Sequence, residues 1–290
     1  MKREFDRSAE DLGNVVGLEH VNTTVPDQTL ATLFYLAGLG LTRDPYLMVD
    51  LDNMWVNVGR SQFHLPAKSP QVLRGHAGLV LPDREALLRR LANVKEKLSG
   101  TAFKYAEHDD YVEAVSPWGN RIRCHAPDEK RFGRIVLGMP YVEFTVPVGS
   151  ADGIARFYEQ VIKTPAKVEE NGEGRCARVM VGKGQDLLFR ETDKPLAEYD
   201  GHHIQIYVAD FSGPYQWLLQ RGLVSEESDQ HQYRFKDIVD PESAKPLFTL
   251  EHEIRSMRHP LYARPLVNRN PEQSNRNYAP GYDAAQPGMS

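Results

Sequence analysis

Histidine is the main supply of reactive side chains in this sequence. The chain has ten histidines but only two cysteines, Cys124 and Cys176, too few for a disulfide framework or a thiolate zinc site. Three histidines, His20, His76 and His203, occupy the same place in three similar short segments. Neutral imidazole is a common metal ligand and a common general base. The recurrence therefore directs attention to the elements that carry these side chains.

Four short segments alternate apolar and polar residues, as a strand with one buried face does. They are LEHVNTTVPD (18–27), GHAGLVLPD (75–83), PYVEFTVPV (140–148) and GHHIQIYVAD (201–210). Each is followed by an amphipathic helix, one of them N-capped by Asp83, and then by short strand candidates separated by Gly, Asn, Asp or Pro turns. The predicted repeat is a βαβββ unit that occurs four times.

Several motifs accompany the four units. Two helices carry Phe-Tyr, in VPDQTLATLFY and VPVGSADGIARFY, and the motifs SPWGNRI and LEHE follow later strands. Together with the histidine positions these features resemble the vicinal oxygen chelate superfamily, over about residues 15–255. That superfamily includes glyoxalase I, bleomycin-resistance proteins and extradiol ring-cleaving dioxygenases. The resemblance implies an α+β fold in which tandem βαβββ units form two cupped half-barrel sheets with helices outside.

The chain divides into two halves of similar length. APDEKRFGRIVLG (126–138) is the natural boundary. We predict an N-terminal pair of units over 1–130, a C-terminal pair over 131–264, and an extended or disordered tail over 265–290, which is rich in Asn, Pro, Gln and Ser. HPLYARP (259–265) is interpreted as a strap that ends the second half.

Strand alternation predicts which side chains enter a cup. They are Leu18, His20, Asn22, Thr24; His76, Gly78, Val80; Tyr141, Glu143, Thr145; and His203, Gln205, Tyr207. The superfamily binds metal through the His of a first strand and the Glu of a last strand. His20, His76 and His203 match the first position, where the third unit has Tyr141, and Glu251 matches the second, sharing its strand face with Glu253. The other units have His64, Arg123 and Phe189 at the carboxylate position.

The pairing of units decides which ligands meet. If units 1 and 2 share a cup, as in ordinary extradiol dioxygenases, neither cup contains two histidines and a carboxylate. If units 1 and 4 share a cup, as in the hydroquinone-cleaving branch, His20, His203 and Glu251 form the facial triad of non-haem Fe(II) oxygenases. We favour the second pairing, which leaves the other cup without a carboxylate ligand. A protein that binds no metal is the remaining alternative.

The resemblance implies a ring-cleaving dioxygenase that uses Fe(II), or else Mn(II) or another divalent metal, on a small aromatic diol of the catechol or hydroquinone type together with O₂. His202, His231 and Arg234 are the candidate catalytic residues, which would manage the proton and developing charge. A tyrosine of the extradiol signature is replaced by Asp237. The alternatives are a redox-neutral isomerase or lyase with Glu143 as its base, and a metal-free protein that binds small molecules.

Composition narrows the partners. Lys and Arg number 35 against 40 Asp and Glu, a net charge of −5, which is unlike the basic footprint of proteins that bind nucleic acid or anionic membranes. No apolar run approaches the roughly 18 residues of a membrane span, and the N-terminus lacks a signal-peptide core. We expect a cytoplasmic protein that binds neither nucleic acid nor membrane. Whether the chain forms a homodimer is left open.

Overall fold

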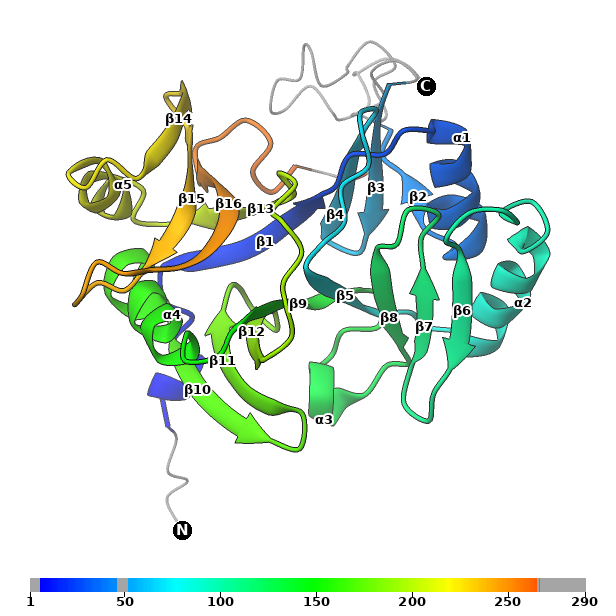
Figure 1. Cartoon of the computed structure of the whole chain (residues 1–290), viewed down its shortest axis with the longest axis horizontal. Coiled ribbons are helices and arrows are strands. Elements are labelled where there is room, and N and C mark those ends of the chain that lie inside the picture. Colours follow the sequence, from blue (N-terminus) through cyan, green and yellow to red (C-terminus); the bar gives the residue numbers. More distant parts are fainter. Residues whose placement is uncertain (1–5, 46–51, 265, 267–290) are drawn as a thin grey trace, which may run out of the picture.

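Sixteen strands form two eight-stranded sheets in the computed structural model, which describes residues 6–45, 52–264 and 266 (Figure 1). The α+β architecture with two cupped sheets is therefore confirmed. Among the described residues no helix is long and apolar enough to cross a membrane. The tail predicted over 265–290 falls outside the described residues except for residue 266.

The first sheet joins unit 1 to unit 4. Its strand order is β14-β15-β16-β13-β1-β4-β3-β2. The strands are β1 (Val15–Asn22), β2 (Thr42–Arg43), β3 (Asn53–Val58), β4 (Ser61–Pro66), β13 (His203–Val208), β14 (Val224–Asp229), β15 (Gln232–Val239) and β16 (Pro246–Ser256). β1 pairs antiparallel with β13, so the predicted pairing of units 1 and 4 is confirmed.

The second sheet joins unit 2 to unit 3, in the order β10-β11-β12-β9-β5-β8-β7-β6. Its strands are β5 (Gly75–Val80), β6 (Lys104–Glu107), β7 (Val112–Val115), β8 (Arg121–His125), β9 (Gly138–Pro147), β10 (Ala166–Asn171), β11 (Gly174–Met180) and β12 (Asp186–Thr192). A short helix, α3 (Glu129–Phe132), links the units. Because each sheet takes one unit from each half, neither 1–130 nor 131–264 forms a sheet of its own.

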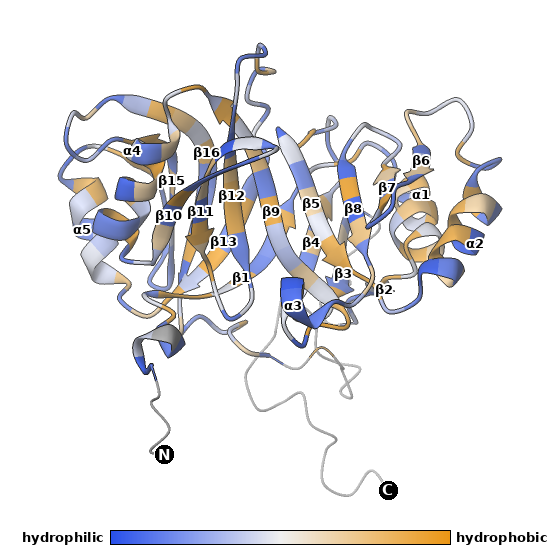
Figure 2. Ribbon diagram, turned by 90° about the horizontal axis from the view of Figure 1, so that it is seen from below, coloured by the Kyte–Doolittle hydropathy of each residue, from blue (hydrophilic) through white to orange (hydrophobic). Residues whose placement is uncertain are grey.

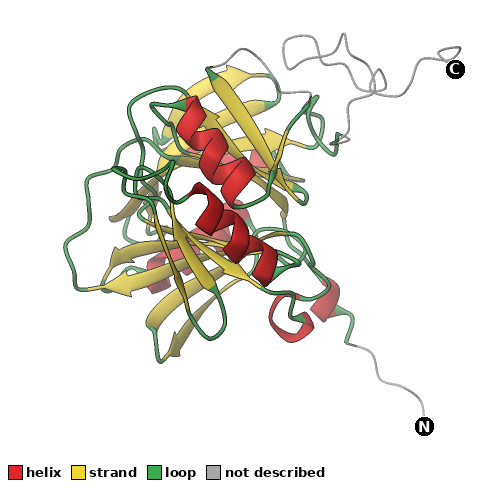
Figure 3. Ribbon diagram, turned by 90° about the vertical axis from the view of Figure 1, so that its right-hand side faces the viewer, coloured by secondary structure: helices red, strands yellow, loops and turns green. Residues whose placement is uncertain are grey.

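Helices pack on the outer faces, with α1 and α2 at one end of the molecule and α4 and α5 at the other (Figures 1 and 2). They are α1 (Gln28–Ala31), α2 (Arg84–Val94), α4 (Ala151–Phe157) and α5 (Ser212–Leu219), and α1 and α4 continue as π-helices over Thr32–Gly38 and Tyr158–Ile162. The predicted cap is confirmed, since the Asp83 carboxylate accepts from the Ala86 N–H. α2 packs against the π-helix of unit 1, so helices as well as strands bridge neighbouring units (Figure 3).

The Phe-Tyr motifs supply the core of both ends. Phe34, Tyr35, Phe157 and Tyr158 are at most 1% exposed. Aromatic side chains of this size contribute much of the apolar area that a core removes from water. The motifs thus anchor each helix to the sheet that carries the cup.

A β-bulge changes the strand faces near the N-terminus. The pairing of β1 with β13 shifts register between Leu18 and His20, so Glu19 is an extra residue on β1. The expectation that Leu18 lines the cup is wrong, because the bulge turns this side chain into the core, where it is 2% exposed. Phe189 is likewise a core residue packed against Phe144, and its neighbour Leu188 lies on the cup face instead.

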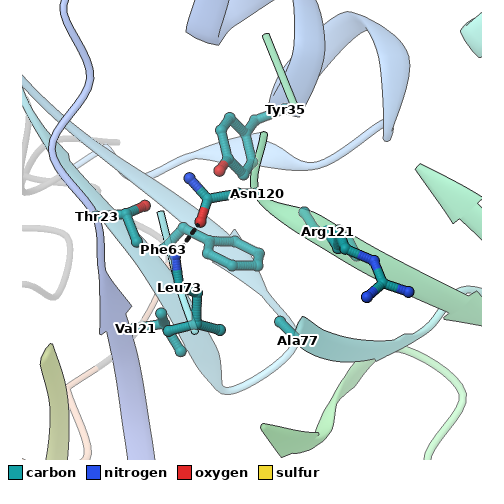
Figure 4. Close-up of a pocket in the computed structure, with 9 residues that line it drawn as sticks. Val21, Thr23, Tyr35, Phe63, Leu73, Ala77, Asn120 and Arg121 are labelled. Atoms are coloured by element: carbon teal, nitrogen blue, oxygen red, sulfur yellow. Dashed lines mark hydrogen bonds between the residues drawn. The ribbon is translucent and has the colours of Figure 1, made fainter. Parts of the chain in front are cut away.

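The two sheets meet at a tightly closed seam. Asn120, from the SPWGN turn, accepts from the Leu73 N–H and donates to the Gln71 carbonyl, each at 2.8 Å. The cavity beside it, between Phe63 and Ala77, measures about 10 Å³ (Figure 4). That space holds about one water molecule, so the seam is a packing feature and not a ligand site.

A buried histidine makes the stability of the fold depend on pH. His252 is fully buried on the core face of β16, where Nδ1 donates to the Leu250 carbonyl at 2.7 Å and Nε2 accepts from the Tyr158 hydroxyl at 2.6 Å. Burial lowers the pKa of His252 to about 4. The unfolded chain, with the ordinary pKa of 6.5, therefore binds more protons than the folded chain below pH 6.5.

We expect the free energy of unfolding to fall as the pH is lowered from 6.5 towards 4, and His252 to account for about 3 kcal/mol of that loss. Urea unfolding in the presence of EDTA at pH 7.5, 5.5 and 4.5 measures it. His252→Gln should remove this part of the pH dependence. An equal loss of stability in wild type and variant would show that His252 is protonated in the folded protein.

Candidate metal centre

The register of the first sheet places four side chains at equivalent positions around a local twofold axis. His20 pairs with Gln205 and Asn22 with His203 on the central strands β1 and β13. On the flanking parallel strands, β4 brings His64 beside Asn22 and β16 brings Glu253 beside Gln205. The axis therefore relates His20 to His203 and His64 to Glu253.

Three of these four side chains form one cluster. His20, His64 and His203 each offer a ring nitrogen, and the three atoms lie within 4.8 Å of one another. The His20 ring centroid is 5.6 Å from that of His64 and 5.8 Å from that of His203. The Nε2 atoms of His20 and His203 are buried, and no described residue gives them a hydrogen-bond partner. Unpaired buried acceptors are costly, which is a reason to expect a ligand for them.

His64 is oriented by its neighbours on the adjacent strand. Its Nε2 donates to the Asn53 Oδ1 at 2.8 Å, which leaves Nδ1 as the atom with a free lone pair. Trp55 stacks on the His64 ring at 3.8 Å and meets the His20 ring edge-on at 4.8 Å. The indole thus fixes two of the three imidazoles.

Two carboxylates of β16 border the cluster. Glu253 accepts from Arg234 at 2.5 Å, forms an ion pair with Arg255 at 2.6 Å, and lies 3.6 Å from the His203 Nε2. Glu251 accepts from Arg234 at 2.7 Å and lies 3.5 Å from the His203 Nδ1. Glu253 is the more deeply buried, with 3% of its side chain exposed against 14%. The assignment of Glu251 as a metal ligand stays a prediction, and the twofold relation favours Glu253.

Glu19, the extra residue of the β-bulge, orients the His20 ring. Its carboxylate lies 3.3 Å from the His20 Nδ1, and it accepts from Arg255 and from the Tyr207 hydroxyl, both at 2.9 Å. A carboxylate on one imidazole nitrogen fixes the proton there, so the Nε2 lone pair points to the cluster. Carboxylate-supported histidine of this kind is common at metal sites.

Electrostatics keeps the cluster uncharged. Burial lowers the pKa of His20 well below its usual value, and the positive charges of Arg255 and Arg234 lower it further. Burial and the neighbouring His20 act the same way on the pKa values of His64 and His203. Neutral imidazole is the form that binds metal, so the ligands need not lose protons first. Burial raises the pKa of Glu253, which the two arginines oppose.

The candidate catalytic residues lie at different distances from this cluster. Arg234 bridges the two carboxylates directly. His202, which directly precedes β13, is buried, and its Nδ1 contacts the Asp200 carboxylate at 2.6 Å. His231 lies in the β14–β15 turn, where its backbone N–H donates to Asp229. The catalytic roles of all three stay predictions.

Comparison with known proteins bears on the fold. No protein-family profile matches the chain, and no curated protein matches it in sequence. A candidate dioxygenase from Bacillus subtilis subsp. subtilis strain 168 superposes with a TM-score of 0.57, at 14% identity over 91% of this chain and 90% of that one. Glyoxalase I from Zea mays gives 0.55, at 13% identity over 83% and 92%. The chain therefore shares the fold of these two proteins, which is the fold that the resemblance to vicinal oxygen chelate proteins implies.

Proposed function

We propose that the chain is a metal-dependent enzyme whose divalent ion is held by His20, His64 and His203 together with a carboxylate of β16, Glu253 by the register of the sheet. The single observation that carries this proposal is the convergence of three neutral imidazoles, two of which, His20 and His203, are buried and have an unpaired Nε2. Three nitrogens and one carboxylate suit Fe(II), and also Mn(II) or another borderline divalent ion.

We propose further that the reaction is O₂-dependent ring cleavage of a small aromatic diol, of the catechol or hydroquinone type. A bound Fe(II) would act as a Lewis acid towards a phenolic oxygen and as an electron donor to O₂. The similarity in fold to a candidate dioxygenase supports this choice only at the level of scaffold, because the same fold carries glyoxalase I.

The surrounding residues have separate tasks in this proposal. Glu19 holds the proton on the His20 Nδ1. Arg234 and Arg255 neutralise the carboxylates and offer positive charge to a phenolate. Tyr207, packed edge-on against Tyr262 at 4.9 Å, helps to keep water out of the cluster. Each task follows from contacts of this chain and can be removed one at a time.

Oxygen uptake tests the reaction. We expect protein purified anaerobically and loaded with Fe(II) to consume O₂ with a catechol or hydroquinone at least roughly a hundred times faster than the protein after chelation, because the ion supplies the redox step. Protein loaded with Zn(II) is the matched control and should be inactive. Turnover without O₂ by the Zn(II) or Mn(II) form would instead indicate an isomerase or lyase, and saturable ligand binding that survives chelation without turnover would indicate a binding protein.

A further inference from the structure

The second sheet encloses a cavity of about 500 Å³ on its concave face. This volume falls within the range of about 300–1,000 Å³ that is usual for small-molecule sites. Side chains of β8, β9, β11 and β12 line it, together with Phe132 of α3. The ribbon of α3 lies close to β9 and is hydrophilic over much of its length (Figure 2). The cavity belongs to the sheet of units 2 and 3, and so is separate from the histidine cluster.

The register shows what replaces the histidine cluster here. On the central strands His76 pairs with Glu143 and Gly78 with Tyr141, and on the flanking strands Gly78 meets Arg123 and Glu143 meets Leu188. The four positions that hold three histidines and Glu253 in the first sheet are thus His76, Tyr141, Arg123 and Leu188. A guanidinium stands where the first sheet has a carboxylate or His64.

Arg123 is the cation of this cavity with the weakest pairing. The other three arginines of the lining have close carboxylates: Arg131 with Asp110 at 2.9 Å, Arg178 with Asp186 at 2.6 Å, and Arg190 with Glu143 at 3.1 Å. Arg123 lies 3.9 Å from the Glu173 carboxylate, on a side chain that is 61% exposed. The Arg123 Nε is buried, and within the described part of the chain it has no hydrogen-bond partner.

Aromatic side chains share the cavity with this guanidinium. The Tyr111 ring centroid lies 4.9 Å from the Arg123 Cζ. Tyr141 and Phe132 also line the cavity, and the Tyr141 hydroxyl contacts the His125 Nε2 at 2.9 Å. Because His125 Nδ1 faces the Asp110 carbonyl and must donate to it, Nε2 accepts and the Tyr141 proton is committed. Tyr141 and Phe132 therefore offer apolar ring surface to a ligand in the cavity.

We propose that this cavity binds a small aromatic carboxylate, with the carboxylate on Arg123 and the ring between the tyrosine and phenylalanine side chains. A guanidinium binds a carboxylate through two parallel hydrogen bonds, which would satisfy the unpaired Nε. One weakly paired cation suits a monoanion better than a phosphate dianion. The site uses no metal, and it goes beyond the reaction proposed for the histidine cluster.

Calorimetric titration of the full chain with benzoate, in EDTA, tests the proposal. We expect saturable binding of one benzoate per chain, and much weaker binding of benzamide, its neutral isostere, and of inorganic phosphate. Arg123→Gln should weaken benzoate binding by roughly tenfold or more, because a charge-assisted bidentate contact is lost. Arg134→Gln is the matched control, since the Arg134 side chain is 94% exposed and outside the cavity lining, and it should bind benzoate as the wild type does.

A second variant keeps the test decisive if Arg123→Gln does not fold. Leu188 lines the cavity at the position related to Arg123, so Leu188→Glu would supply the carboxylate that Arg123 lacks and should also abolish benzoate binding. Three outcomes would overturn the proposal: no saturable binding of benzoate, equal binding of benzamide or phosphate, or undiminished binding by a folded Arg123 or Leu188 variant. The EDTA makes each outcome independent of the metal site.

Discussion

His20→Ala should lose its metal as completely as His203→Ala, although 183 positions separate these residues in the chain. Elemental analysis of protein loaded anaerobically with Fe(II) should give about one iron per chain for the wild type and less than about a tenth of that for either variant. Each variant removes one ligand, while the cost of transferring the ion from water into a buried site stays the same. The physical reason is the shared sheet, in which β1 and β13 are hydrogen-bonded neighbours.

His76→Ala is the matched control for this experiment. His76 lies on β5, the equivalent strand of unit 2, and is 3% exposed. Its buried Nε2 has no partner among the described residues, so its environment closely resembles that of His20. It should retain its iron, because the related positions in its sheet are Arg123 and Leu188. Unchanged iron in His20→Ala, or equal loss in His76→Ala, would show that the metal is not bound at the histidine cluster.

The sequence alone predicts the fold because the pattern within each unit and the recurrence of that pattern along the chain indicate the same architecture. Period-2 alternation marks the first strand of each unit, and the Phe-Tyr motifs mark the helices that cover the sheets. The pairing of units 1 and 4 followed from chemistry: only that pairing gathers two histidines with a carboxylate, and the structure confirms it.

The errors in the site came from register, which alternation alone does not determine. The bulge at Glu19 adds one residue to β1 and turns Leu18 into the core. No turn residue marks the position of this bulge in the sequence. His64, which the sequence places at the carboxylate position of unit 1 but not among the predicted ligands, contributes to the cluster. The signal that could have found it is the symmetry of the units, since the last strand of unit 1 must bring one residue to the same axis as the last strand of unit 4.

The same symmetry gives the sharpest prediction for the carboxylates of β16. Glu253→Gln should reduce the iron content to less than about a tenth of the wild-type value, whereas Glu251→Gln should retain most of it. Glu253 is the twofold partner of His64 and faces the unpaired His203 Nε2, while Glu251 faces the Nδ1. Both variants keep the size of the side chain, so they differ only in which charge is removed.

Stability provides a second measurement on the same pair, made without metal. Burial lowers the pKa of Arg255, and the carboxylates of Glu253 and Glu19 more than offset this effect. Glu253→Gln removes one of these two carboxylates and leaves the buried Arg255 charge less well neutralised. Breaking a buried ion pair typically costs about 3–5 kcal/mol, and a more exposed pair costs far less, so Glu251→Gln should change the free energy of urea unfolding little. If Glu251→Gln instead empties the site while Glu253→Gln keeps its iron, the facial triad of His20, His203 and Glu251 is the ligand set, and Glu253 serves only to neutralise the two arginines.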